Sequence, residues 1–131
     1  MANQLKAEPK RIAVLTRAGL GDAVYVIPAL RVLRRHYPKA HITAITGERG
    51  YPLLLRCPYI DHLALRHLGN GIRGKLQEII RLRRGCFDLA VILDTSDEKT
   101  LHTFLAGIRY RAGGVKRRFG RLLTHPFCLP E

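Results

Sequence analysis

Residues 11–22 read Arg11-Ile-Ala-Val-Leu-Thr-Arg-Ala-Gly-Leu-Gly-Asp22, an apolar run that passes into a glycine-containing turn. The run is rich in β-branched residues and predicts a buried strand over 11–16. From Ala23 onward, apolar residues recur every three or four positions, which predicts a helix over about 23–36 that ends before Pro38. A buried strand, a glycine turn and an amphipathic helix in this order are typical of an α/β fold.

The same alternation of strand and helix continues along the chain. Further strands are predicted at 41–46, 61–67, 87–93 and 110–115, and further helices at 51–56, 72–83 and 99–106, with Gly107 as the C-terminal stop of the last helix. In the helix at 72–83, the apolar positions Ile72, Leu76, Ile79 and Ile80 are expected to face the core, beneath a cationic outer face. The handedness of strand–helix–strand connections then predicts a Rossmann-like parallel sheet with helices on both faces.

The predicted organisation is a polar tail at 1–10, one domain at 11–123 and the start of an interdomain linker at 124–131. The tail lacks the apolar segment of a secretory signal, and no run reaches the roughly 20 apolar residues that a membrane span requires. The 3 cysteines are isolated from one another, which predicts neither a disulfide framework nor a zinc ribbon and favours a reducing, cytoplasmic location.

The charge is strongly positive, with 23 Lys and Arg against 10 Asp and Glu and a formal net charge of +13. This excess predicts an anionic partner such as nucleic acid, an anionic membrane surface or a phosphorylated glycan. The basic residues form two sets: Arg66, Arg73, Lys75, Arg81, Arg83 and Arg84, and then Arg109, Arg111, Lys116, Arg117, Arg118 and Arg121. A solvated helix face explains the first set equally well, whereas a ligand or membrane surface better explains the second. Few aromatic residues interleave with the second set, so base stacking on single-stranded nucleic acid is not supported.

Ligands of an open parallel sheet bind where strands end and helices begin. At the first such junction, Gly19 and Gly21 flank Leu20 and let the backbone approach a ligand closely. Asp22 follows at the positive end of the helix dipole, which favours its ionised form. Such a carboxylate can accept a proton from an incoming hydroxyl. Capping of the helix is the structural alternative for Asp22, and the two roles are compatible.

The second junction follows the strand at 87–93. Thr95, Ser96 and Lys99 are expected at the same edge of the sheet as Asp22, where they would bind polar groups of a ligand or cap the next helix. No metal site is predicted, because acidic residues are common where helices begin and the histidines lack zinc spacing. The loop at 19–22 lacks the third glycine of a dinucleotide fingerprint and the Gly-Lys-Ser/Thr of a Walker loop.

Several segments, taken in chain order, resemble a known enzyme family. They are Arg11-Ile-Ala-Val-Leu-Thr-Arg-Ala-Gly-Leu-Gly-Asp-Ala-Val24, Ile27-Pro-Ala-Leu-Arg-Val-Leu-Arg-Arg-His-Tyr-Pro38, Tyr51-Pro-Leu-Leu54, Cys57-Pro-Tyr-Ile-Asp61, Phe87-Asp-Leu-Ala-Val-Ile-Leu-Asp94, Leu105-Ala-Gly-Ile-Arg109, Leu122-Leu-Thr-His-Pro126 and Leu129-Pro-Glu131. These segments and their order resemble the N-terminal part of the ADP-heptose:lipopolysaccharide heptosyltransferases, which form glycosyltransferase family nine. One departure is that Glu98 occupies a place where the family often has a basic residue, with Lys99 adjacent.

The resemblance implies the N-terminal half of a GT-B fold, whose acceptor is a phosphorylated glycolipid of the Kdo-lipid A type. It also implies that ADP-heptose binds a C-terminal domain, that transfer needs no metal or other cofactor, and that the aspartate matching Asp22 is the general base. We therefore expect an acceptor-binding domain of lipopolysaccharide biosynthesis, peripheral to the inner leaflet of the cytoplasmic membrane. It would be inactive unless a partner chain or second domain holds the donor, so enzymatic activity is left open. The alternative is a basic nucleic-acid-binding or nucleotide-binding α/β module, with nucleic acid the less favoured partner.

Overall fold

The computed structural model describes residues 9–16, 20–47, 51–65, 71–93, 97–114 and 125–127. Six strands form one sheet: β1 (Arg11–Leu15), β2 (His41–Thr46), β3 (His62–Leu65), β4 (Leu89–Ile92), β5 (Tyr110–Gly114) and β6 (His125–Phe127). The strand order is β3-β2-β1-β4-β5-β6, and every neighbouring pair is parallel.

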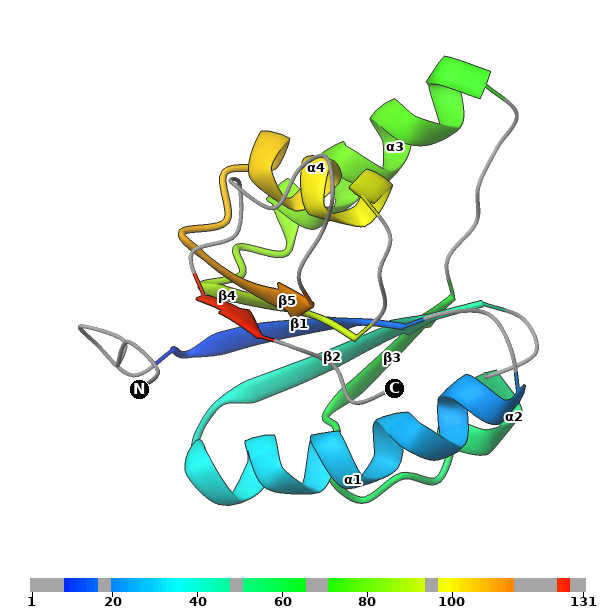
Figure 1. Ribbon diagram of the computed structural model, residues 1–131, viewed down its shortest axis with the longest axis vertical. Coiled ribbons are helices and arrows are strands. Elements are labelled where there is room, and N and C mark those ends of the chain that lie inside the picture. Colours follow the sequence, from blue (N-terminus) through cyan, green and yellow to red (C-terminus); the bar gives the residue numbers. More distant parts are fainter. Residues whose placement is uncertain are drawn as a thin grey trace.

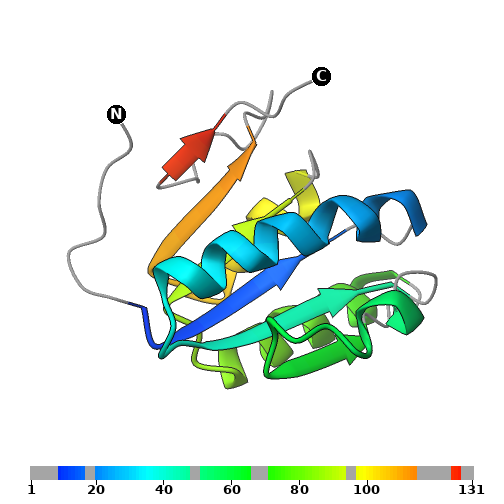
Figure 2. The ribbon, with the colours of Figure 1, turned by 90° about the horizontal axis from the view of Figure 1, so that it is seen from below.

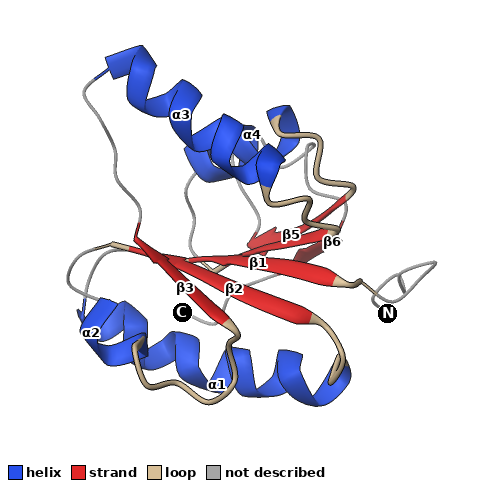
Figure 3. Ribbon diagram, turned by 180° about the vertical axis from the view of Figure 1, so that it is seen from behind, coloured by secondary structure: helices blue, strands red, loops and turns tan. Residues whose placement is uncertain are grey.

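Four helices cover the two faces of this sheet: α1 (Leu20–His36), α2 (Tyr51–Leu54), α3 (Gly71–Arg84) and α4 (Asp97–Leu105). Helices α1 and α2 lie on one face, and α3 and α4 lie on the other (Figure 1). The view from behind shows the same three layers, with the strands between the two pairs of helices (Figure 3). The predicted Rossmann-like fold with helices on both faces is confirmed.

Alternate residues of β1 contribute to two separate cores. Ile12 and Val14 pack with Val26 and Leu30 of α1, whereas Ala13 and Leu15 belong to a second cluster with Leu82 of α3. All residues of β4 are buried, as expected for a central parallel strand. Burial of both faces explains why these strands are apolar throughout rather than alternating with polar residues.

The orientation of α3 differs from the prediction. Its buried residues are Gly74, Glu78 and Leu82, while Ile72, Leu76 and Ile80 are exposed to solvent. Gly74 has no side chain, so this buried position contributes no apolar group to the inner face. The buried Glu78 lies with Oε2 3.3 Å from Nδ1 of His102 on α4, so a polar contact forms part of the inner face. Of the four apolar positions predicted to face the core, Ile79 packs against it and the other three do not.

Two further boundaries differ from expectation. Helix α1 begins at Leu20, earlier than predicted, and continues through Pro28 to His36. Within the segment 124–131, which was predicted as a linker, residues His125–Phe127 pair with β5 and extend the sheet at its edge (Figure 2). Gly107, two residues after the end of α4, has a positive φ of 78°, as predicted for a helix stop. None of the described helices is both long and apolar enough to cross a membrane.

Candidate active site at the carboxyl edge of the sheet

The strand order reverses direction between β1 and β4, which makes this the switch point of the sheet. From β1 the chain adds β2 and β3 on one side, and after α3 it returns to add β4, β5 and β6 on the other side. The connections that follow β1 and β4 therefore leave the sheet toward opposite faces, although Leu15 and Ile92 are direct partners in the ladder. In open parallel sheets, ligands bind at this switch point, beyond the carboxyl ends of the two strands.

The residues predicted for the site come from the two segments that follow these strands. Leu20, Gly21 and Asp22 form the first turn of α1, and Lys99 lies in the first turn of α4. Gly19, Thr95 and Ser96 lie outside the described residues, as do the side-chain orientations of Asp22 and Lys99. The backbone thus brings both predicted segments to one switch point. Convergence of their side chains at this point stays a prediction.

Asp22 is the third residue of α1, so the N-cap position precedes it. A carboxylate in the first turn lies at the positive end of the helix dipole, which stabilises its negative charge. A place in the first turn is compatible with both predicted roles of Asp22, proton acceptance and stabilisation of the helix end, and both stay predictions.

Two buried threonines at this edge were not singled out from the sequence. Thr16 follows β1, and Thr46 ends β2; their exposed fractions are 1% and 0%. The Thr16 N–H donates to the carbonyl of Ile45 at 3.1 Å. The Thr46 hydroxyl has no hydrogen-bond partner within the described part of the chain. Their only signal in the sequence is a threonine that closes each apolar run.

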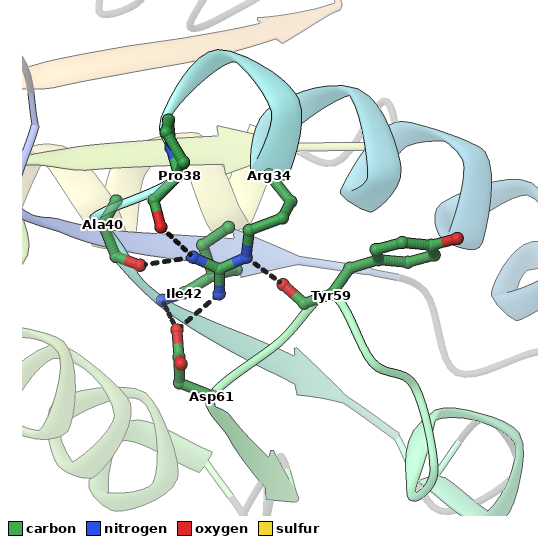
Figure 4. A network of polar contacts seen from close by, with 6 residues as sticks. All are labelled: Arg34, Pro38, Ala40, Ile42, Tyr59 and Asp61. Atoms are coloured by element: carbon green, nitrogen blue, oxygen red, sulfur yellow. Dashed lines mark hydrogen bonds and ion pairs between the residues drawn. The ribbon is translucent and has the colours of Figure 1, made fainter.

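A polar network at the opposite, amino edge of the sheet is structural (Figure 4). Asp61 Oδ2 accepts hydrogen bonds from Arg34 Nη2 at 2.6 Å and from the Ile42 N–H at 2.8 Å. Arg34 also donates to the carbonyls of Tyr59 at 3.1 Å, Ala40 at 2.7 Å and Pro38 at 3.3 Å. The network joins the end of α1 to the beginnings of β2 and β3.

The charge state of Asp61 follows from opposing effects. Burial alone raises the pKa of the carboxyl. The hydrogen bond from Ile42, the hydrogen bond and charge of Arg34, and the charge of His41 outweigh that effect, so the pKa of Asp61 lies below its ordinary value of 3.8. Asp61 is therefore a charged structural residue at neutral pH.

The described members of the second basic set make contacts within the chain. Arg111 Nη1 donates to the carbonyl of Ile108 at 2.5 Å, and its guanidinium lies 5.1 Å from the ring centre of Phe104. Burial lowers the pKa of Arg111, yet a guanidinium stays charged at neutral pH. Arg109 lies over the ring of Tyr110 at 5.2 Å. For these two arginines, packing against the chain explains much of what the sequence suggested was a ligand surface.

The described residues show no metal cluster, and a hollow that they line lies away from the carboxyl edge. In the part of the chain that the structure describes, no three His, Cys, Asp or Glu side chains come together as a metal site. Asp94 and the side chains of Asp97 and Glu98 lie outside that part. A hollow of about 420 Å³ is present, but it lies at the amino ends of β1 to β3 and is lined by Arg11, His41, His62 and Arg81 among others.

Several curated proteins that are similar to this chain are named as heptosyltransferases. Lipopolysaccharide heptosyltransferase 2 of Escherichia coli strain K12 is 32% identical over 108 residues, which are 79% of this chain and 30% of the relative. Lipooligosaccharide heptosyltransferase 2 of Haemophilus ducreyi is 27% identical over 105 residues, with the same coverage. The chain thus spans about a third of the length of these relatives. No protein-family model matches it.

Solved structures agree with the sequence relatives. The structure of E. coli ADP-heptose lipopolysaccharide heptosyltransferase II aligns with a TM-score of 0.77 at 26% identity, over 92% of this chain and 35% of that one. A glycosyl transferase of family 9 from Veillonella parvula shares the fold with a TM-score of 0.83 at 24% identity, over 98% of this chain and 38% of that one. By sequence and by fold together, the chain is similar to lipopolysaccharide heptosyltransferases over about a third of their length, and it shares its fold with a family 9 glycosyl transferase.

Proposed function

We propose that the protein binds the phosphorylated inner-core glycolipid that accepts heptose, and that it forms the acceptor side of a heptosyltransferase. The observation that carries this proposal is the 32% identity to a heptosyltransferase over 79% of the chain. The fold supports it, because the parallel sheet has its switch point beside the helix that begins with Leu20-Gly-Asp22. The net charge of +13 is suited to a phosphorylated ligand.

In the proposed reaction, a hydroxyl oxygen of the acceptor attacks the anomeric carbon of ADP-heptose. A new carbon–oxygen bond forms there as the bond from that carbon to the β-phosphate oxygen breaks, and ADP leaves with the electron pair. Asp22 takes the hydroxyl proton as general base, so the acceptor oxygen gains nucleophilicity while it attacks. Attack opposite the leaving group inverts the anomeric centre. The proposed steps use no metal ion bound by this chain.

The proposal concerns the acceptor side, and the matched region spans 30% of the relative. A second domain, in the same or another polypeptide, holds ADP-heptose in this proposal. General-base assistance contributes little without a donor positioned against the acceptor. Thr95, Ser96 and Lys99 are assigned to polar groups of the acceptor, with the glycines at 19 and 21 allowing its close approach.

The test compares Asp22→Asn with the unaltered protein in two measurements. Titration with phosphorylated Kdo-lipid A headgroup should show saturable binding to both, with dissociation constants within about threefold of each other. With the donor-binding domain present, the substitution should lower kcat by about 10²- to 10⁴-fold, because the base is lost while binding persists.

Asp61→Asn is the control, because Asp61 lies at the amino edge and should leave kcat unchanged at a temperature where the variant is folded. Duplex DNA should fail to displace the glycolipid. Full activity of the Asp22→Asn variant would remove the proposed base. An absence of saturable glycolipid binding, or its displacement by DNA, would favour the basic nucleic-acid-binding alternative.

A further inference from the structure

The outer face of α3 carries a row of exposed aliphatic side chains. Ile72, Leu76 and Ile80 expose 75%, 52% and 49% of their surface. They are spaced four residues apart, so they lie in one row along the helix. The N-terminal end of α3 stands off the sheet, as two opposite views show (Figures 1 and 3). A surface helix normally turns such a row toward the core.

The buried side of the same helix explains why the row cannot face inward. Glu78 is buried against His102, and Gly74 and Leu82 are buried one turn to either side. Residues two positions apart are separated by about 200° around a helix, so Leu76 and Ile80 point away from Glu78. Rotating α3 to bury the aliphatic row would carry the buried polar pair into solvent and remove its packing.

Positive charge accompanies the exposed row. Helix α3 contains five basic residues, all exposed: Arg73, Lys75, Arg81, Arg83 and Arg84. Its one acidic residue, Glu78, lies on the buried side. Arg81 donates to the Leu65 carbonyl at 2.6 Å, which directs it toward the sheet. The outward surface of α3 therefore combines an aliphatic row with the exposed cations Arg73, Arg83 and Arg84.

We propose that the outer face of α3 docks on an anionic membrane surface. A helix with a cationic face and exposed large aliphatic residues lies in the interface plane, with the aliphatic side chains at the boundary between headgroups and acyl chains. Arg73, Arg83 and Arg84 then contact anionic headgroups. The inference does not rest on the transferase function, because it follows from the exposure and charge of α3 alone.

Charge complementarity favours lipid over a second copy of this chain. A symmetric contact between two α3 helices would pair the same surface with itself and bring two sets of five cations together. Like charges brought together at an interface oppose association. An anionic bilayer instead covers the aliphatic row and neutralises the arginines in one contact.

The experiment measures partitioning of the protein onto vesicles of phosphatidylcholine with and without 30% phosphatidylglycerol, by co-sedimentation. Ile72→Gln/Leu76→Gln/Ile80→Gln removes the aliphatic row, and Arg73→Gln/Arg84→Gln removes two of its cations. The matched control is Arg31→Gln/Arg35→Gln on α1, on the opposite face of the sheet, which also removes two exposed cations. Circular dichroism verifies that each variant is folded.

The protein should bind the anionic vesicles and leave the zwitterionic ones in solution. The α3 double variant should bind about 30-fold more weakly, and the α1 double variant should stay within about threefold of the unaltered protein. The triple variant should bind the anionic vesicles at least about tenfold more weakly. Equal losses for the α1 and α3 variants, no binding to anionic vesicles, or dimerisation through α3 in sedimentation equilibrium would each overturn the proposal. The vesicles contain no sugar acceptor, so this experiment tests lipid binding alone. A negative result would therefore leave the acceptor proposal unaffected.

Discussion

Asp61 and Arg34 join three segments that are distant in the chain. The guanidinium of Arg34 donates to three carbonyls near the end of α1 and before β3, and its remaining donor reaches Asp61. Both residues belong to the segments that resemble the heptosyltransferases, Ile27–Pro38 and Cys57–Asp61. Their hydrogen bonds hold the fold together at the amino edge, away from the proposed acceptor site.

Replacing Asp61 with Asn should destabilise the protein at pH 7 by about 1 kcal/mol, after allowance for the solvent screening of a half-exposed ion pair. Because the folded-state pKa of Asp61 lies below the unfolded value near 3.8, its charge stabilises the fold above that pH. The stabilisation is lost as the pH falls through and below that value. Urea unfolding of both proteins between pH 7 and pH 2.5 measures the difference.

The difference in free energy of unfolding between Asp61→Asn and the unaltered protein should shrink as the pH falls. Arg34→Lys is a useful companion, because it keeps the charge and loses the planar set of donors. A deficit that stays constant over the whole pH range would show that the carboxylate charge is not what stabilises this network.

At the residue level, the sequence predicts Asp22 as the candidate base, and this role stays a prediction. A glycine turn followed by a helix marks the position, and the structure places Asp22 in the first turn of α1. Sequence reasoning passed over Thr46, since a threonine that ends an apolar strand resembles any strand residue. Its burial and its lack of a partner among the described residues become visible only when β2 is packed beside β1.

Among the elements, α3 shows where periodicity fails. Ile79 packs against the core as predicted, but Ile72, Leu76 and Ile80 are exposed, because a glycine and a glutamate occupy part of the inner side. Periodicity cannot recognise an acidic residue as buried when its partner, His102, lies on another helix. The strands were easier to predict, since β1, β2 and β4 are apolar runs bounded by glycine, proline or charged residues.

The Glu78–His102 contact should contribute to stability through coupling between the helices. Glu78→Leu should destabilise the fold by about 2–4 kcal/mol, because His102 loses a partner in a buried site. The double variant Glu78→Leu/His102→Leu should cost less than the sum of the two single variants by at least about 1 kcal/mol. Urea unfolding of the four proteins completes the cycle. Simple additivity would show that the two side chains are neighbours without an energetic link.

For the whole molecule, the sequence predicted a parallel sheet covered on both faces but not the order of its strands. The order matters for function, because it decides that β1 and β4 flank the switch point. Pairing between strands that are distant in the chain leaves no local pattern in the sequence. The same reason explains why β6 was missed, since His125–Phe127 is short and contains a proline, and it is a strand only through its partner β5.

Hydrogen exchange with and without phosphorylated Kdo-lipid A headgroup, followed by mass spectrometry, tests most directly whether an acceptor binds at the carboxyl edge. The account predicts slower exchange in peptides that span the junctions from β1 to α1 and from β4 to α4. Peptides that contain the Arg34–Asp61 network and α3 should exchange at the same rate in both samples. Slowing confined to the amino ends of β1 to β3, or to α3, would contradict the assignment of this edge as the acceptor site.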